Sequence, residues 1–135
     1  MTSKKDSGDF SARDRSVRAF FSVNTVNMTN RDISHVTIKP STRKDKKLMA
    51  QFIDASGRRI KTTHFGGAGC MDFIKYSKLD PAHAKQKRLQ YIKRHRVRES
   101  WRDPTAAGTL SRYILWEKPT LNASLKKYRM MFRLD

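Results

Sequence analysis

The stretch KLMAQFIDASGRRIKTTHF, residues 47–65, decides how this chain folds. Residues 47–53 alternate between apolar and polar side chains, as in a strand with one buried face. The loop 54–57 ends in Gly57, which readily adopts the positive φ that a tight hairpin requires. Residues 58–65 are rich in β-branched side chains and return as the partner strand. The stretch therefore predicts an antiparallel hairpin whose first strand turns three apolar side chains to the core: Leu48, Ala50 and Phe52.

A third short strand precedes this hairpin. The sequence HVTIK, residues 35–39, alternates in the same way and stops at Pro40, which is disfavoured inside a sheet. A charged connector, STRKDKK, joins it to the hairpin. We therefore expect three antiparallel strands, with three basic side chains exposed along one surface: Lys47, Arg59 and Lys61.

Helical patterns follow the strands. Two Asp-Pro pairs, at 80–81 and 103–104, are typical helix starts, because aspartate caps free N–H groups and proline fits the first turn. A third helix begins at 119–120, and its amphipathic stripe is the clearest in the chain. The expected apolar positions are Leu89, Ile92 and Val97 in the first helix, Leu110, Tyr113 and Ile114 (with Glu117 at the same spacing) in the second, and Leu121, Leu125, Tyr128 and Phe132 in the third.

Strands followed by helices predict an α+β fold, a small three-stranded antiparallel sheet followed by about three helices packed on one face. Residues 1–34 are expected to form an extended N-terminal arm, and residues 35–135 a basic domain. The arm is polar apart from a short apolar segment, so by composition it should not fold alone. We expect it to lie along neighbouring proteins, with Phe20 and Phe21 as its anchor.

The charge of the chain is strongly one-sided. Lys and Arg number 30 against 12 Asp and Glu, which gives a formal net charge of +18. The arm carries six basic and four acidic residues, so the excess belongs to the domain. Such a surface favours a partner of negative charge, and bulk charge does not choose among nucleic acid, an anionic membrane and acidic protein surfaces. The chain contains no apolar run long enough to span a bilayer, so no transmembrane segment is expected.

A glycine-rich stretch, KTTHFGGAGCMDF at residues 61–73, is the first candidate for chemistry. A phosphate-binding P-loop needs Lys and Ser or Thr after its last glycine, but Cys70 and Met71 follow here. Three glycines are therefore expected to form the bend between the sheet and the helices: Gly66, Gly67 and Gly69. A small anion-binding nest of their backbone N–H groups is the alternative. Cys70, the single cysteine, is expected to be a small buried hydrophobe rather than a nucleophile activated by His64.

No other pattern supports an enzyme. The histidines and the cysteine lack the paired spacing of metal ligands, and no pair of carboxylates sits in an apolar setting suited to acid–base catalysis. We therefore expect no catalytic residue, no metal site, no cofactor and no small-molecule substrate.

The sharpest positive signal is the basic helix between residues 85 and 102. It carries eight basic side chains against one acid, Glu99. A solvated surface normally mixes both signs, so this helix is expected to contact phosphate or protein carboxylates. The predicted partner-binding residues are Lys85, Lys87, Arg88, Lys93, Arg94, Arg96, Arg98 and Arg102.

Residues 47–130 resemble a family of small basic proteins encoded by large double-stranded DNA viruses of algae and amoebae. The shared pattern is a bend, an arginine-rich helix and a series of short motifs in fixed order. In this sequence the matching residues are His64-Phe65-Gly66, Tyr91 to His95, Asp103-Pro104, Ala107-Gly108, Ser111-Arg112 and Leu115 to Leu121. The resemblance implies a viral setting, and it supplies no catalytic residue.

Two functions fit these expectations. The first is a minor capsid protein that bridges or cements larger capsid subunits, with its basic domain against their acidic surfaces and its arm threaded between them. The alternative is a protein that binds nucleic acid without sequence specificity and packages the viral genome. The absence of any base-reading motif in the sequence favours the first. Both place the protein in the virion, and in the host cytoplasm or nucleus before assembly.

Overall fold

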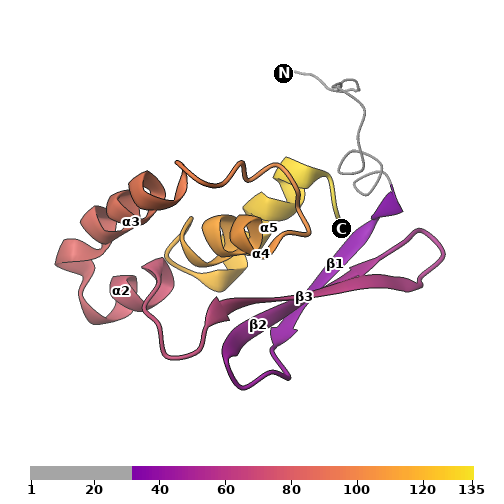
Figure 1. The fold of residues 1–135 in the computed structure, drawn as a ribbon, viewed down its shortest axis with the longest axis horizontal. Coiled ribbons are helices and arrows are strands. Elements are labelled where there is room, and N and C mark those ends of the chain that lie inside the picture. Colours follow the sequence, from indigo (N-terminus) through magenta and orange to yellow (C-terminus); the bar gives the residue numbers. More distant parts are fainter. Residues whose placement is uncertain (1–31) are drawn as a thin grey trace. The chain divides into compact units, whose positions relative to one another are not determined.

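The computed structural model describes residues 32–135, whose course is drawn in Figure 1. A three-stranded antiparallel sheet comes first and four α-helices follow, which confirms the predicted α+β class. In chain order the elements are β1 (His35–Pro40), β2 (Lys46–Ile53), β3 (Arg59–Gly67), α2 (Phe73–Leu79), α3 (Pro81–His95), α4 (Ala107–Leu110), the π-helical turn η1 (Ser111–Leu115) and α5 (Leu121–Phe132).

The central strand of the sheet is β2. It pairs antiparallel with β1 on one side and with β3 on the other. Phe52 lies opposite Val36, and both side chains are fully buried. The predicted hairpin loop is present, since Asp54 accepts hydrogen bonds from the backbone N–H groups of Ser56 and Arg58, and Gly57 has a φ of 90°. The alternation seen in the sequence therefore sets the register of the sheet.

Helices α4 and α5, with η1, cover one face of this sheet, whereas α2 and α3 lie to one side of it (Figure 1). The core lies between the sheet and this covering layer. Its largest fully buried side chains include Phe52 and Phe65 from the strands and Tyr128 from α5. Burial of each of these side chains contributes roughly 1.5–3 kcal/mol. The Tyr128 hydroxyl donates a 2.6 Å hydrogen bond to the Pro104 carbonyl, so its one polar atom is satisfied inside the core.

Helix α5 confirms its predicted start and its apolar stripe. The Thr120 side chain accepts a hydrogen bond from Ala123 N, which satisfies a free donor of the first turn. Tyr128 is fully buried, and the other three stripe residues pack against the core: Leu121, Leu125 and Phe132.

Helix α2 was not expected from the sequence. Asp72 caps it by accepting a 2.8 Å hydrogen bond from Lys75 N. The second oxygen of Asp72 accepts from Lys47 Nζ at 2.5 Å, and both side chains are largely buried. The predicted exposure of Lys47 is therefore wrong, because this lysine holds the start of α2 against the sheet.

The apolar stripe predicted for α3 is also wrong in its register. Leu89 is 62% exposed and Val97 is 76% exposed, whereas Ala84 and Tyr91 are buried. The reason is a tertiary contact, since the Tyr91 ring stacks on Trp116 with centroids 4.3 Å apart. A buried aromatic therefore sets which side of α3 faces inward.

The middle helix begins later than predicted. Asp103 does not cap it, because its Oδ1 accepts from the N–H and the hydroxyl of Thr105 in a tight turn. Helix α4 starts only at Ala107, and the chain then widens into η1, where Trp116 N donates to Ser111 O five residues back.

The boundary of the domain also differs from the expectation. Ile33 is a buried core residue, and Ser34 N donates to Ile53 O at 2.9 Å. Both residues were assigned to the arm, but they belong to the folded domain. Residues 1–31 of the predicted arm, including the anchor Phe20 and Phe21, lie outside the described residues.

Candidate functional site

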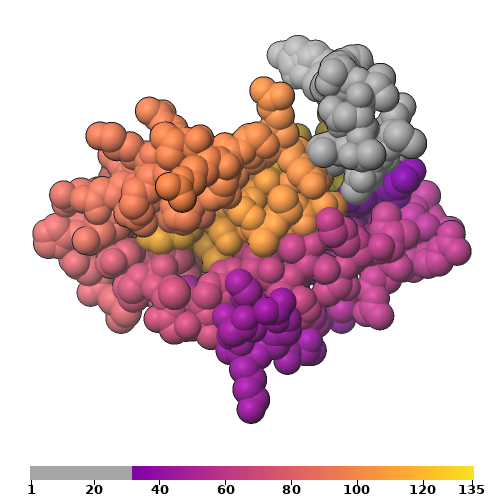
Figure 2. All heavy atoms as spheres, viewed as in Figure 1, coloured from indigo at the N-terminus to yellow at the C-terminus, as the bar shows by residue number. Residues whose placement is uncertain are grey.

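Six basic side chains of α3 and of the loop after it are exposed, and we call them the basic face. Within residues 32–135 none of the six forms an ion pair. Atoms of this segment, coloured salmon to orange, project from the surface in Figure 2. The basic face consists of Lys85, Lys93, Arg94, Arg96, Arg98 and Arg102.

The other two predicted partner-binding residues turn inward. Arg88 donates from Nε to the Trp116 carbonyl and from Nη2 to Glu117 Oε1, both at 2.8 Å. Lys87 is half-buried, with its Nζ 6.0 Å from the centroid of the Tyr76 ring. Arg88 therefore binds within the domain and is not part of the basic face, which corrects its predicted role in binding a partner.

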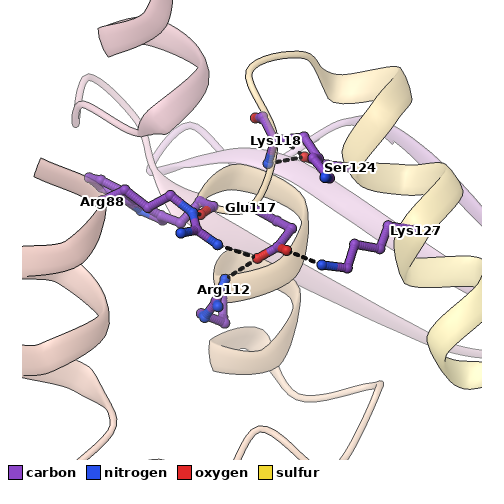
Figure 3. Close-up of polar contacts among 7 residues, drawn as sticks. Arg88, Arg112, Glu117, Lys118, Ser124 and Lys127 are labelled. Atoms are coloured by element: carbon purple, nitrogen blue, oxygen red, sulfur yellow. Dashed lines mark hydrogen bonds and ion pairs between the residues drawn. The ribbon is translucent and has the colours of Figure 1, made fainter. Parts of the chain in front are cut away.

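A buried carboxylate, Glu117, collects cations from three different elements (Figure 3). Its side chain is only 6% exposed. It accepts hydrogen bonds from Arg88 of α3, from Arg112 of η1 at 2.6 Å, and from Lys127 of α5. Burial by itself raises the pKa of the Glu117 carboxyl, but the bonds from Lys127, Arg112 and Arg88 outweigh burial and lower the pKa to about 2. This cluster ties α3, the support of the basic face, to the core.

An aromatic stack holds the same helix. Tyr91 lies between Trp116 and His95, with centroid distances of 4.3 Å and 4.2 Å. Burial is the main cause that raises the pKa of the Tyr91 hydroxyl to about 12. The stacked rings and the ion cluster together fix which side of α3 faces the core, and so which side carries the exposed cations.

The loop between α3 and α4 is held by the one acid of the basic segment. Glu99 Oε2 lies 2.8 Å from His95 Nδ1, and Glu99 Oε1 accepts a 3.2 Å bond from Trp101 Nε1. Trp101 has a φ of 55°, which is rare for a large side chain. The sequence drew attention to Glu99 only as a count of charge, and it carried no signal for these contacts.

Two exposed apolar side chains lie among these cations. Leu89 is one helical turn from both Lys85 and Lys93, and Val97 lies about one turn beyond Lys93. Arg96 N still donates to Ile92 O, so the helical path continues to the neighbourhood of Val97. The face therefore combines positive charge with apolar surface.

The glycine stretch lies away from this arrangement of contacts. Gly66 and Gly67 end β3, and Gly69, with a φ of 82°, lies in the turn before α2. A Cβ on Gly66 would come within 2.6 Å of Leu115, so glycine permits the close approach of β3 and η1. His64 Nδ1 is 2.7 Å from Ser41 Oγ.

The predicted burial of Cys70 is wrong. Its side chain is exposed, because the tight turn in which Cys70 N donates to Gly67 O carries it to the surface.

The sequence did not predict the ion cluster of Glu117 and Arg112. The available signal was the position of Glu117, an acid at helical spacing with Leu110 and Ile114. An acid on an apolar face indicates a buried carboxylate that requires cations nearby.

Residues 32–135 hold no group of three or more His, Cys, Asp or Glu side chains placed to bind a metal ion. No helix in this range is both long and apolar enough to cross a membrane.

Comparison with known proteins gives one partial match. Residues 36–95 match a family model described as a family of unknown function, DUF5754. The matched range runs from β1 to the end of α3, so it includes the sheet and the helical part of the basic face. No curated protein matches this chain. No solved structure matches it.

Proposed function

We propose that this protein is a minor structural component of the virion of a large double-stranded DNA virus. In this proposal the basic face binds acidic surfaces of larger capsid subunits and cements them together. The observation that carries the proposal is that six exposed cations have no ion-pair partner within residues 32–135, while Glu99 and Glu117 are turned inward. A surface of one sign repels itself, and an acidic partner relieves that repulsion.

Protein carboxylates fit the basic face better than phosphates alone, for a reason of composition. Leu89 and Val97 expose apolar surface among the cations, and contact with a protein buries such surface, whereas phosphate oxygens do not. Four of the six cations are arginines, whose planar guanidinium groups bind carboxylates in paired hydrogen bonds.

The viral setting of the proposal rests on the resemblance of residues 47–130 to small basic viral proteins. The N-terminal segment has a separate role in it, as a tether between neighbouring subunits, with Phe20 and Phe21 as its anchor. No catalytic residue, cofactor or small-molecule substrate enters the proposal.

Charge reversal on α3 tests the proposal. Virus carrying Lys93→Glu with Arg94→Glu is compared with virus carrying Lys44→Glu with Lys126→Glu, which removes the same charge at exposed positions elsewhere. The protein is quantified against the major capsid subunit in shells stripped of DNA. We expect a constant ratio in wild type and control, and a strong loss from shells of the α3 variant. If the wild-type protein leaves with the DNA, the capsid role is wrong.

Binding of nucleic acid is the second candidate, and the same six cations, exposed and without an ion pair in the described part of the chain, favour it. Contact with six or more phosphates predicts that affinity for unrelated DNA falls on the order of a thousandfold between low and moderately high salt. If the affinity for DNA depends only weakly on salt and the protein is retained in DNA-free shells, the nucleic-acid role is excluded and the capsid role stands.

A further inference from the structure

The loop after α3 carries three of the six cations of the basic face and has an unusual backbone. Arg96, Arg98 and Arg102 are exposed on it. Trp101, between them, has a φ of 55°, in the left-handed region that large side chains rarely adopt. Such a conformation persists only where surrounding contacts hold it, and residues of this kind cluster at functional sites.

The contacts that hold the loop come from Glu99. This residue is the only acid between positions 85 and 102, and within residues 32–135 it forms no ion pair with an arginine. Both of its carboxylate oxygens have partners in this segment, one with His95 Nδ1 at 2.8 Å and the other with Trp101 Nε1 at 3.2 Å. The acid therefore joins the end of α3 to the loop and leaves the neighbouring cations unneutralised.

The indole of Trp101 is held from its other side by η1. The Arg112 guanidinium lies 5.4 Å from the centroid of a Trp101 ring, and the Tyr113 ring meets the indole edge-on with centroids 6.4 Å apart. Arg112 is itself bound to Glu117. A continuous set of contacts thus runs from the buried ion cluster to the loop.

We propose that Glu99 is a positioning residue, which clips Trp101 so that Arg96, Arg98 and Arg102 form a preformed site for a carboxylate-rich protein surface. The inference rests on the proposed function and names how its partner is bound. A loop that is already ordered loses less conformational freedom on binding, and this raises affinity without any new contact. Three arginines on such a loop match surface carboxylates in geometry as well as in charge.

Two neutral variants separate positioning from charge. Glu99→Ala and Glu99→Gln remove the same negative charge, so electrostatics alone raises affinity for an acidic probe equally in both. Only glutamine retains a side-chain oxygen that accepts from Trp101 Nε1–H. With the full chain and a short polyglutamate peptide as probe, we expect Glu99→Ala to bind about threefold to tenfold more weakly than Glu99→Gln. Equal affinities of the two variants would overturn the proposal.

A second measurement and a second probe complete the test. Hydrogen exchange of the amides of residues 96–102 should be faster in Glu99→Ala than in Glu99→Gln, at temperatures where both remain folded. Equal exchange rates in the two variants would overturn the proposal that Glu99 positions the loop. A short DNA duplex replaces the peptide in a parallel series, and an Ala–Gln difference seen with DNA alone would refute a carboxylate partner. Loss of binding on charge reversal of Lys93 and Arg94, with equal affinities of the Glu99 variants, would leave the proposed function standing and reject the clip.

Discussion

Glu99 lies directly against Gly108. A Cβ added to Gly108 would clash with the Glu99 carboxylate, with Oε1 nearest, so a side chain in the first turn of α4 requires this carboxylate to move. Gly108 is a helical residue whose φ is not positive, so the requirement is for space and not for conformation. This contact links the packing of α4 to the position of the loop that follows α3.

Gly108→Ala is therefore expected to destabilise the protein, although alanine has the higher helix propensity. The added methyl must displace the Glu99 carboxylate, and overpacking of this kind costs about 1–3 kcal/mol. Urea denaturation followed by circular dichroism measures the free energy of unfolding. Ala107→Ser, at the exposed neighbouring position, serves as the matched control and should change stability by less than about 0.5 kcal/mol. Equal stability of Gly108→Ala and wild type would show that Glu99 moves aside freely.

Helix α3 gives a contrast between neighbouring positions. Leu89→Ser is expected to leave stability within about 0.5 kcal/mol of wild type, because Leu89 is exposed. Tyr91→Ala is expected to cost about 3 kcal/mol or more, because it removes the ring stacked between Trp116 and His95. Thermal and urea unfolding of both variants provide the measurement. A large loss of stability in Leu89→Ser would support the apolar stripe that the sequence predicted for α3.

The same exposed positions discriminate between the two candidate partners. Leu89→Ser combined with Val97→Ser changes no charge, so binding to a DNA duplex should be unaffected. Retention in DNA-free shells should fall, because a protein partner buries these side chains. Met130→Ser, at a side chain that is 72% exposed on α5, is the control for loss of apolar surface elsewhere. Normal retention of the Leu89–Val97 variant would remove the compositional argument for a protein partner.

The strand region was predictable because its signals are local. Alternation around Phe52 and the glycine at 57 fix strand, face and turn within a few residues. The register of α3 was not predictable, because Tyr91 is buried by Trp116, a residue 25 positions later in the chain. Six of the eight cations predicted for partner binding are exposed and have no ion pair within residues 32–135. Arg88 instead binds Glu117, a contact between distant segments that no local pattern reports. The exposure of the six cations could be predicted from the composition of the segment, but the ion pair of Arg88 with a distant residue could not.

Removal of residues 1–30 tests the N-terminal arm as a tether. The truncated chain retains residues 32–135, so its thermal unfolding should resemble that of the full domain. Retention in DNA-free shells should fall while affinity for a DNA duplex changes little, because the arm contributes few net charges. The double variant Phe20→Ser with Phe21→Ser should reproduce part of the loss, and normal assembly without the arm would contradict the tether.

The buried carboxylate of Glu117 makes stability depend on pH in a defined window. Its pKa is about 2 in the folded protein, against an ordinary value of 4.5, so the folded state favours the ionised form. The stabilisation is fully present above about pH 4.5 and is lost as the pH falls toward 2, because the unfolded chain binds the proton first.

Glu117→Gln leaves Arg88, Arg112 and Lys127 without their shared partner and should cost about 3 kcal/mol at neutral pH. Urea denaturation of both proteins between pH 7 and pH 2.5 should show the gap narrowing below pH 4.5. The other carboxyls titrate in both proteins, so the difference between the two curves isolates Glu117, and a gap that stays constant down to pH 2.5 would mean that the carboxylate is not held by the three cations.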